Sequence, residues 1–137
     1  MKLAFVYAGQ GSQFAGMGKD LYENYPAARA VFDQFPADFD LRTTCFADPE
    51  GLLNQTRYTQ PCMLAVAMAI TDILAENGIT PEMTAGLSLG EYSALYCAGV
   101  LDRQTAAELI TFRGQAMQKA SEGVESGMTA ILGLDRE

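Results

Sequence analysis

The segment Gly86-Leu87-Ser88-Leu89-Gly90 matches the G-x-S-x-G pattern of a nucleophile elbow. The pattern needs glycines because the serine sits on a tight strand-to-helix turn, where flanking side chains would clash. Such a turn lifts the hydroxyl to the edge of a sheet, and the backbone N–H of Leu89 can then stabilise an oxyanion. Ser88 is therefore the candidate nucleophile for covalent catalysis. A structural glycine-rich turn is the alternative.

A second glycine-rich loop, residues 8–13, follows the first apolar run of the chain. In a parallel sheet both loops lie at the C-terminal edge, where ligands bind. The backbone N–H of Gln10 is then a candidate second oxyanion donor. Two phosphate-loop patterns fail, because Phe14 stands where a dinucleotide fingerprint needs glycine and Met17-Gly18 stands where a P-loop needs Lys-Ser/Thr.

Arg113 falls on the apolar face of a predicted helix. A cation there is costly to bury unless it meets an anion, and the planar guanidinium suits a carboxylate. A structural ion pair within the chain and a snorkelling side chain are the alternatives. Gln60 could point its amide at the same site, although glutamines at helix N-termini are usually solvated. Three methionines at core spacing are expected to pack in the interior: Met63, Met68 and Met117.

The 137 residues contain no histidine. Histidine is the usual general base near neutral pH. A Ser-His mechanism therefore cannot be completed by these residues alone.

Helices between widely spaced strands predict an α/β fold with a parallel sheet. The segment 36–47 looks irregular. Strands are expected at residues 3–7, 83–87 and 128–134. Helices are expected at residues 27–35, at a short segment through 52–53, through 92–95, and from a cap at Asp102 to about 121. The strongest predicted helix runs from about residue 60, with Pro61 in its first turn, through 74, and Asn77-Gly78 ends it.

Composition excludes several classes of protein. The net charge of −8 is the opposite of what a nucleic-acid binder needs. Three cysteines without a C-x-x-C spacing predict buried free thiols rather than a disulfide framework or a zinc site. No apolar stretch approaches the length of a membrane span, and the N-terminal run is too short for a signal peptide, so a cytoplasmic protein is expected.

Several segments together resemble the malonyl-CoA:acyl-carrier-protein transacylases, the acyltransferases of fatty-acid and polyketide synthesis. They occur in family order across nearly the whole chain. The matching segments are residues 9–13 (Gly-Gln-Gly-Ser-Gln), 59–61 (Thr-Gln-Pro), 86–92, Arg113-Gly114 with Met117, and 127–133.

The resemblance implies a role for each matched residue. Ser88 would be acylated by malonyl-CoA, Arg113 would bind the malonyl carboxylate, and Gln60 would line the pocket. The backbone amides of Gln10 and Leu89 would form the oxyanion hole. The acyl group would then pass to the phosphopantetheine thiol of an acyl carrier protein in a ping-pong reaction. No metal and no tightly bound cofactor is implied, and neither nucleic acid nor membrane is an expected partner.

Two departures from the family matter. Leu87 stands where members usually carry histidine just before the nucleophile. Members are also considerably longer, and their catalytic histidine lies beyond the point that this sequence reaches. The resemblance thus implies that residues 1–124 are the N-terminal part of a hydrolase-like core, and that residues 125–137 begin a small ferredoxin-like subdomain. A missing C-terminal half would be a further partner.

Three functional hypotheses remain open at this stage. The first is an acyltransferase fragment that is inactive or weak without its second half. The second is a non-catalytic or scaffold subunit of the same family. The third is a serine hydrolase that uses a base other than histidine.

Overall fold

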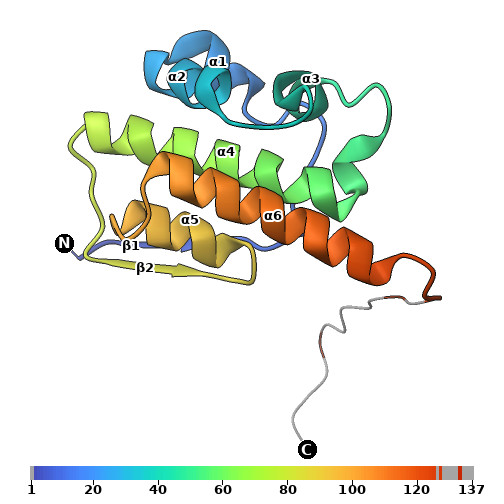
Figure 1. Cartoon of the computed structure of the whole chain (residues 1–137). Helices are drawn as coiled ribbons and strands as arrows, with labels where there is room; N and C mark the ends of the chain where they lie inside the picture. Colours follow the sequence, from blue (N-terminus) through green and yellow to red (C-terminus); the bar gives the residue numbers. More distant parts are fainter. Residues whose placement is uncertain (1, 126, 128–132, 134–137) are drawn as a thin grey trace, which may run out of the picture.

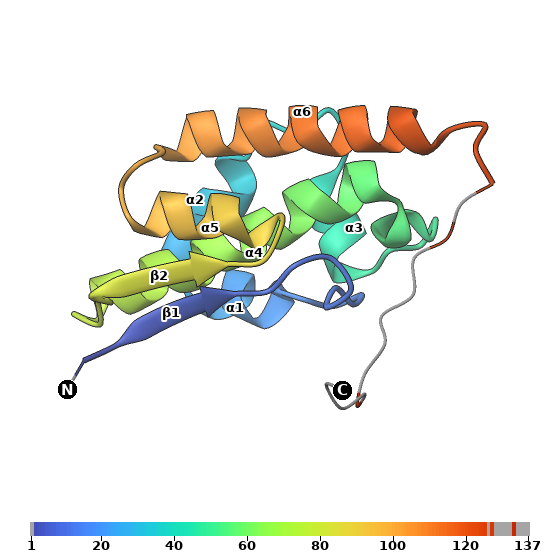
Figure 2. The same cartoon turned by 90° about the horizontal axis from the view of Figure 1, so that it is seen from below.

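The computed structural model describes residues 2–125, 127 and 133. Its sheet has two parallel strands, β1 (Ala4–Tyr7) and β2 (Met83–Gly86). The register pairs Ala4 with Met83 and Tyr7 with Gly86, so both strands end at the same edge. Figure 2 shows the loop after β1 and the turn after β2 at this shared edge. The predicted α/β fold with a parallel sheet is confirmed.

The central helix of the molecule is α4 (Thr56–Glu76). It packs against α2, α3, α5 and α6, and Figure 1 shows it between α1–α3 on one side and α5 with the two strands on the other. It is long and apolar enough to cross a membrane by length and composition alone. In this fold it forms the core through nine buried residues: Thr59, Gln60, Pro61, Cys62, Leu64, Ala65, Met68, Ala69 and Thr71.

The start of α4 differs from the sequence prediction. Pro61 indicated a first turn near residue 60, because proline lacks the N–H that a helix interior needs. The helix instead begins one turn earlier, at Thr56, and holds Pro61 inside it. Its predicted end is confirmed, since Asn77 is the C-cap and Gly78 has the positive φ of 73° that favours glycine after a helix.

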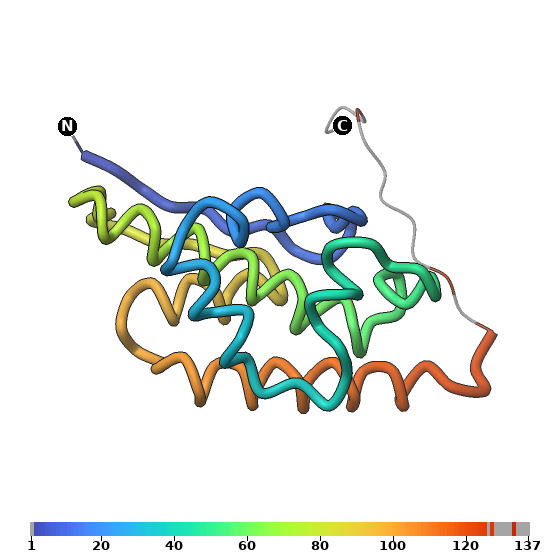
Figure 3. Tube along the Cα trace, turned by 90° about the horizontal axis from the view of Figure 1, so that it is seen from above, coloured from blue at the N-terminus to red at the C-terminus, as the bar shows by residue number. Residues whose placement is uncertain are grey.

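Three short helices cover one side of α4: α1 (Lys19–Asn24), α2 (Pro26–Gln34) and α3 (Leu41–Phe46). Figure 3 shows this part of the chain crossing over α4. The expectation of an irregular segment over 36–47 is confirmed for residues 36–40 and was wrong for Leu41–Phe46. Asp40 caps α3 by accepting from the backbone N–H of Thr43 at 3.0 Å. Asp48 accepts from the N–H groups of Leu52 and Leu53, at the predicted short helix η1 (Leu52–Asn54).

The last two helices are α5 (Gly90–Cys97) and α6 (Arg103–Ser121). The predicted cap at Asp102 is confirmed, since its carboxylate accepts from the backbone N–H of Thr105 at 2.7 Å. The expected strand at 128–134 lies mostly outside the described residues. The division into residues 1–124 and 125–137 therefore stays a prediction.

All three cysteines are free thiols, as expected. Cys45 and Cys62 are buried, whereas Cys97 is only half-buried. A hydrogen bond with Cys62 and burial both raise the pKa of the Cys45 thiol, so this thiol is not a candidate nucleophile.

Candidate active site

Ser88 occupies a strained turn between β2 and α5. Its φ is +55°, in the left-handed region that non-glycine residues seldom adopt. The two flanking glycines are required by packing. A Cβ on Gly86 would collide with the backbone of Gly90, and a Cβ on Gly90 would collide with the carbonyl oxygen of Tyr7. The backbone therefore holds an exposed serine at the edge of the sheet, as the G-x-S-x-G pattern predicted.

The structure brings the guanidinium of Arg113 to this serine. Arg113 Nη2 donates to Ser88 Oγ at 2.9 Å, and Nη1 donates to Gln60 Oε1 at 2.6 Å. The guanidinium carbon also lies 5.7 Å from the centre of the Tyr92 ring, within the range of a cation–π contact. Within the described residues, Arg113 makes no ion pair with any carboxylate. The alternative of a structural ion pair thus has no support in this part of the chain.

The side chain of Gln60 is fully buried. This burial excludes the alternative of a solvated glutamine. Its Oε1 accepts from Arg113, and its Nε2 lies 3.3 Å from Met117 Sδ. Sulfur is a weak hydrogen-bond acceptor, so the Gln60 amide NH₂ group can still donate to a stronger acceptor beside Met117.

Met117 was expected to pack in the interior, which is wrong. Its side chain is 42% exposed and lies next to Gln60, one helical turn beyond Arg113 on α6. Met68 is fully buried and Met63 is packed against the core, as expected. The i, i+4 spacing of Arg113 and Met117 was the available signal that both reach the same site.

The loop after β1 lies against the backbone of the elbow. A Cβ on Gly9 would come within 2.9 Å of the carbonyl oxygen of Leu87, so only glycine permits this approach. The side chain of Leu87 lies over Gly9 and is 73% exposed. Within the described residues, the backbone N–H groups of Gln10 and Leu89 donate to no acceptor. The fold therefore uses neither N–H in this part of the chain, and Leu89 itself is buried.

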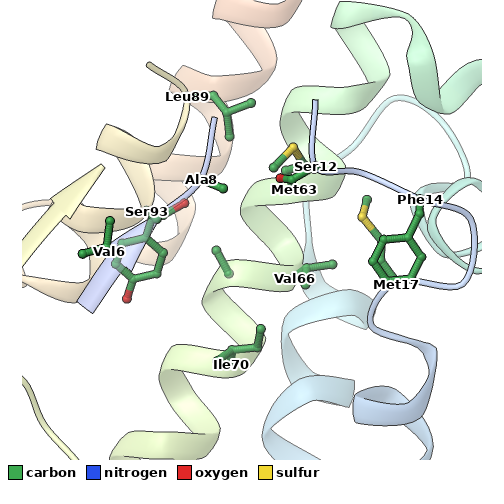
Figure 4. Close-up of a pocket in the computed structure, with 12 residues that line it drawn as sticks. Val6, Ala8, Ser12, Phe14, Met17, Met63, Val66, Ile70, Leu89 and Ser93 are labelled. Carbon is green, nitrogen blue, oxygen red and sulfur yellow. The ribbon is translucent and has the colours of Figure 1, made fainter. Parts of the chain in front are cut away.

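An apolar cavity of about 290 Å³ flanks the site between β1, the following loop and α4. Figure 4 shows Val6 and Ala8 on one side of it and Met63, Val66 and Ile70 of α4 on the other. Of the elbow residues, only Leu89 lines this cavity, so it lies beside Ser88 rather than over it.

Tyr7 lines the same cavity, and its hydroxyl forms a 2.8 Å hydrogen bond with Thr71 Oγ1. Burial raises the pKa of this phenol, so Tyr7 stays protonated and does not act as a base near neutral pH. The described residues also contain no group of His, Cys, Asp or Glu side chains arranged to hold a metal ion.

Comparison with known proteins places these features in a family. Residues 4–136 match the model of the acyl transferase domain. The chain is 44% identical over 138 residues to the malonyl CoA-acyl carrier protein transacylase of Bacillus subtilis, covering 99% of this chain and 44% of the relative. It is 45% identical over 140 residues to the transacylase of the same name from Haemophilus influenzae, covering 99% and 45%. The chain thus spans less than half the length of these relatives.

Solved structures agree with this assignment. The crystal structure of the transacylase from Clostridium perfringens superposes with a TM-score of 0.83 at 42% identity, over 88% of this chain and 39% of that one. A type II polyketide-synthase acyl carrier protein in complex with its malonyl-transacylase gives a TM-score of 0.81 at 42% identity, over 88% and 40%. The resemblance inferred from the sequence motifs is confirmed, and this chain belongs to the acyl transferase domain family.

Proposed function

We propose that this chain forms part of an acyltransferase that moves a malonyl group from coenzyme A to an acyl carrier protein through an acyl-enzyme on Ser88. The observation that carries the proposal is the 2.9 Å contact between Arg113 Nη2 and Ser88 Oγ. It joins a nucleophile on an elbow to a cation without a carboxylate partner among the described residues. The names of the relatives, malonyl CoA-acyl carrier protein transacylases, support the same chemistry.

The first half-reaction forms the acyl-enzyme. Ser88 Oγ attacks the thioester carbonyl of malonyl-CoA and gives up its proton to a base. The carbonyl oxygen becomes an oxyanion, which the backbone N–H groups of Gln10 and Leu89 stabilise. The oxyanion then re-forms the carbonyl, the C–S bond breaks, and coenzyme A leaves as a thiol after taking a proton. In the second half-reaction the phosphopantetheine thiol of the carrier protein attacks the seryl ester, and Ser88 regains its proton.

Arg113 supplies affinity for the malonyl carboxylate. Its guanidinium is held by Gln60 Oε1 on one side and by the Tyr92 ring on another. Two of its five N–H donors are used in the structure, which leaves donors for a carboxylate next to Ser88. A carboxylated acyl group is therefore favoured over a simple ester, which argues for transfer of malonyl and against a serine hydrolase of general specificity.

The proton acceptor is proposed to lie outside these 137 residues, because they contain no histidine. The relatives are more than twice as long as the matched segment, so they hold ample chain to supply it. We propose that the ferredoxin-like subdomain begins near residue 125. A carrier-protein complex of a similar transacylase supports the second substrate. No bound cofactor or metal takes part in the proposed reaction, and the cytoplasmic location stays a prediction.

The proposal is tested by transfer to a carrier protein. The chain is mixed with the part of the Bacillus subtilis relative that follows the aligned region, together with malonyl-CoA and a phosphopantetheinylated acyl carrier protein. We expect malonyl-carrier protein to form only when both polypeptides are present. Ser88→Ala should abolish it. Undiminished transfer by Ser88→Ala, with the second polypeptide alone inactive, would exclude Ser88 as the nucleophile.

The same assay addresses the scaffold hypothesis. A stable complex of the two polypeptides that never acylates Ser88 would favour a non-catalytic subunit. Complex formation is measured by size-exclusion chromatography with light scattering, independently of acyl transfer.

A further inference from the structure

The hydroxyl of Thr56, the first residue of α4, is bonded to the side chain of Gln10. Gln10 Nε2 lies 3.0 Å from Thr56 Oγ1, and Gln10 Oε1 lies 3.2 Å from the same oxygen. A hydroxyl can accept one hydrogen bond and donate another. The Thr56 hydroxyl can therefore accept from the amide nitrogen of Gln10 and also lies within reach of its amide oxygen. Within the described residues, this hydroxyl has no other hydrogen-bond partner, and the N-cap of α4 uses no side chain. The hydroxyl is therefore not needed to start the helix.

A second side-chain contact joins the loop after β1 to the residues just before α4. Gln13 Nε2 donates to Asn54 Oδ1 at 3.1 Å, while the backbone N–H of Gly11 donates to Gln13 Oε1 at 2.8 Å. The loop contains Gly9 and Gly11, and Gly11 has a φ of +115°. Glycines leave the backbone free to rotate, and Ser12 Oγ donates to the Gly9 carbonyl at 3.3 Å within the loop. The side-chain contacts of Gln10, Ser12 and Gln13 therefore restrict the direction of the peptide N–H groups together.

Thr56 and Gln60 are four residues apart on α4 and therefore lie on the same face of the helix. Thr56 contacts the loop that carries Gln10, and Gln60 contacts Arg113. The first turns of α4 thus set the separation between the proposed oxyanion donor and the proposed carboxylate ligand. The two contacts involve different side chains, so removing one leaves the other in place.

We propose that Thr56 is a positioning residue: its hydroxyl holds the Gln10 side chain and so fixes the direction of the Gln10 backbone N–H toward the oxyanion that forms at Ser88. The inference rests on the proposed function, because it assigns a role within the same site. Within the described residues, the Thr56 hydroxyl bonds only the Gln10 side chain, so its proposed role acts through Gln10.

The matched substitutions are Thr56→Val, which removes the hydroxyl and keeps the branched shape, and Thr56→Ser, which keeps the hydroxyl. The rate of acylation by malonyl-CoA is measured in the two-polypeptide mixture. We expect Thr56→Val to lower kcat roughly tenfold or more, since removing an oxyanion donor outright costs about 10²–10³. KM for malonyl-CoA should change little because the contact between Gln60 and Arg113 is intact. Thr56→Ser should stay near the parent rate.

A second measurement tests the positioning when Ser88 is not acylated at all. Hydrogen–deuterium exchange on the chain compares the backbone amides of residues 9–13 with those of α4. We expect Thr56→Val to speed exchange in the loop several-fold while the α4 amides after the first turn stay protected, and Thr56→Ser to restore the parent pattern. Thr111→Val is the control, because that hydroxyl bonds only the Ala107 carbonyl within α6.

The outcomes separate this inference from the proposed function. Absence of acylation in every variant, with faster loop exchange in Thr56→Val, would contradict the proposed function and keep the positioning role. Unchanged loop exchange in Thr56→Val would overturn the positioning role, as would an equal loss of kcat in Thr56→Ser and Thr56→Val.

Discussion

At the scale of single residues, Arg113 is the charged group in contact with Ser88. A half-buried guanidinium is costly unless polar groups replace its water. Here the Gln60 amide oxygen, the Ser88 hydroxyl and the Tyr92 ring do so, and all three are uncharged. The remaining positive charge has no carboxylate partner in the described part of the chain. An incoming carboxylate is the group that this arrangement lacks.

The substitution Arg113→Ala should therefore weaken malonyl transfer more than acetyl transfer. The lost charge-assisted hydrogen bonds are worth about 1.5–3 kcal/mol, which corresponds to about 10–150-fold in kcat/KM for malonyl-CoA. Acetyl-CoA has no carboxylate to lose. The ratio of the two kcat/KM values in the two-polypeptide mixture is the measurement, with Arg42→Ala, whose side chain is 50% exposed, as the control. Equal losses on both substrates would remove Arg113 from the carboxylate role.

At the scale of elements, the sequence was sufficient to predict a turn or a helix end where a single residue type enforces the local geometry. Gly86 and Gly90 predict the elbow because no other residue fits there. Asp102 predicts the start of α6 because its carboxylate caps the helix. The start of α4 could not be predicted in this way. Pro61 favours a boundary, but packing of α4 against four helices outweighs one missing hydrogen bond. The contact of Thr56 with Gln10 depends on that packing, so no local pattern revealed it.

The close approach of α6 to the start of α4 depends on Gly114. A Cβ there would lie 3.2 Å from both the Cα of Arg57 and the carbonyl oxygen of Thr56. On an exposed helix face, replacing glycine by alanine stabilises by about 1 kcal/mol. At this position we expect the opposite sign, a loss of about 1–3 kcal/mol from overpacking, together with a displaced Arg113. Urea denaturation checks the sign, with Ala116→Ser on the exposed face as the control. A stabilised Gly114→Ala would contradict the packing argument.

At the scale of the whole molecule, one polar network joins three helices. Arg103 Nη2 lies 2.6 Å from Asp72 Oδ2, and the Tyr96 hydroxyl donates to Asp72 Oδ1 at 2.6 Å. Asp72 lies in the later part of α4, Tyr96 near the end of α5 and Arg103 at the start of α6, so the network ties these three helices together. Figure 2 shows the link from α5 to α6 away from the turn that follows β2.

This network makes stability sensitive to alkaline pH. Burial, followed by the hydrogen bond to Asp72, raises the pKa of Tyr96 from 10.0 to about 12. The unfolded chain therefore loses this proton before the folded chain does. The contribution of Tyr96 to stability is fully present below pH 10 and is lost as pH rises through about 12. Denaturation midpoints are measured from pH 10 to about pH 12, and over this range Tyr96→Phe should lose less stability than the parent chain. An unchanged alkaline slope would contradict the linkage.

The two-stranded sheet carries exposed apolar side chains. The side chains of Val6 and Met83 are 78% and 61% exposed, and Val6 also lines the apolar cavity of Figure 4. The relatives devote more than half of their length to segments that this chain does not match. We therefore expect the proposed activity to need residues beyond the segment that this chain matches.

The most direct test of the account is the mass of this chain after brief incubation with malonyl-CoA and the second polypeptide, followed by peptide mapping. We expect a single malonyl group on the peptide that contains Ser88, and no adduct on Ser88→Ala. The adduct should also fall sharply in Arg113→Ala. A malonyl group that persists in Ser88→Ala, or a parent chain that forms the complex and stays unmodified, would contradict the central claim.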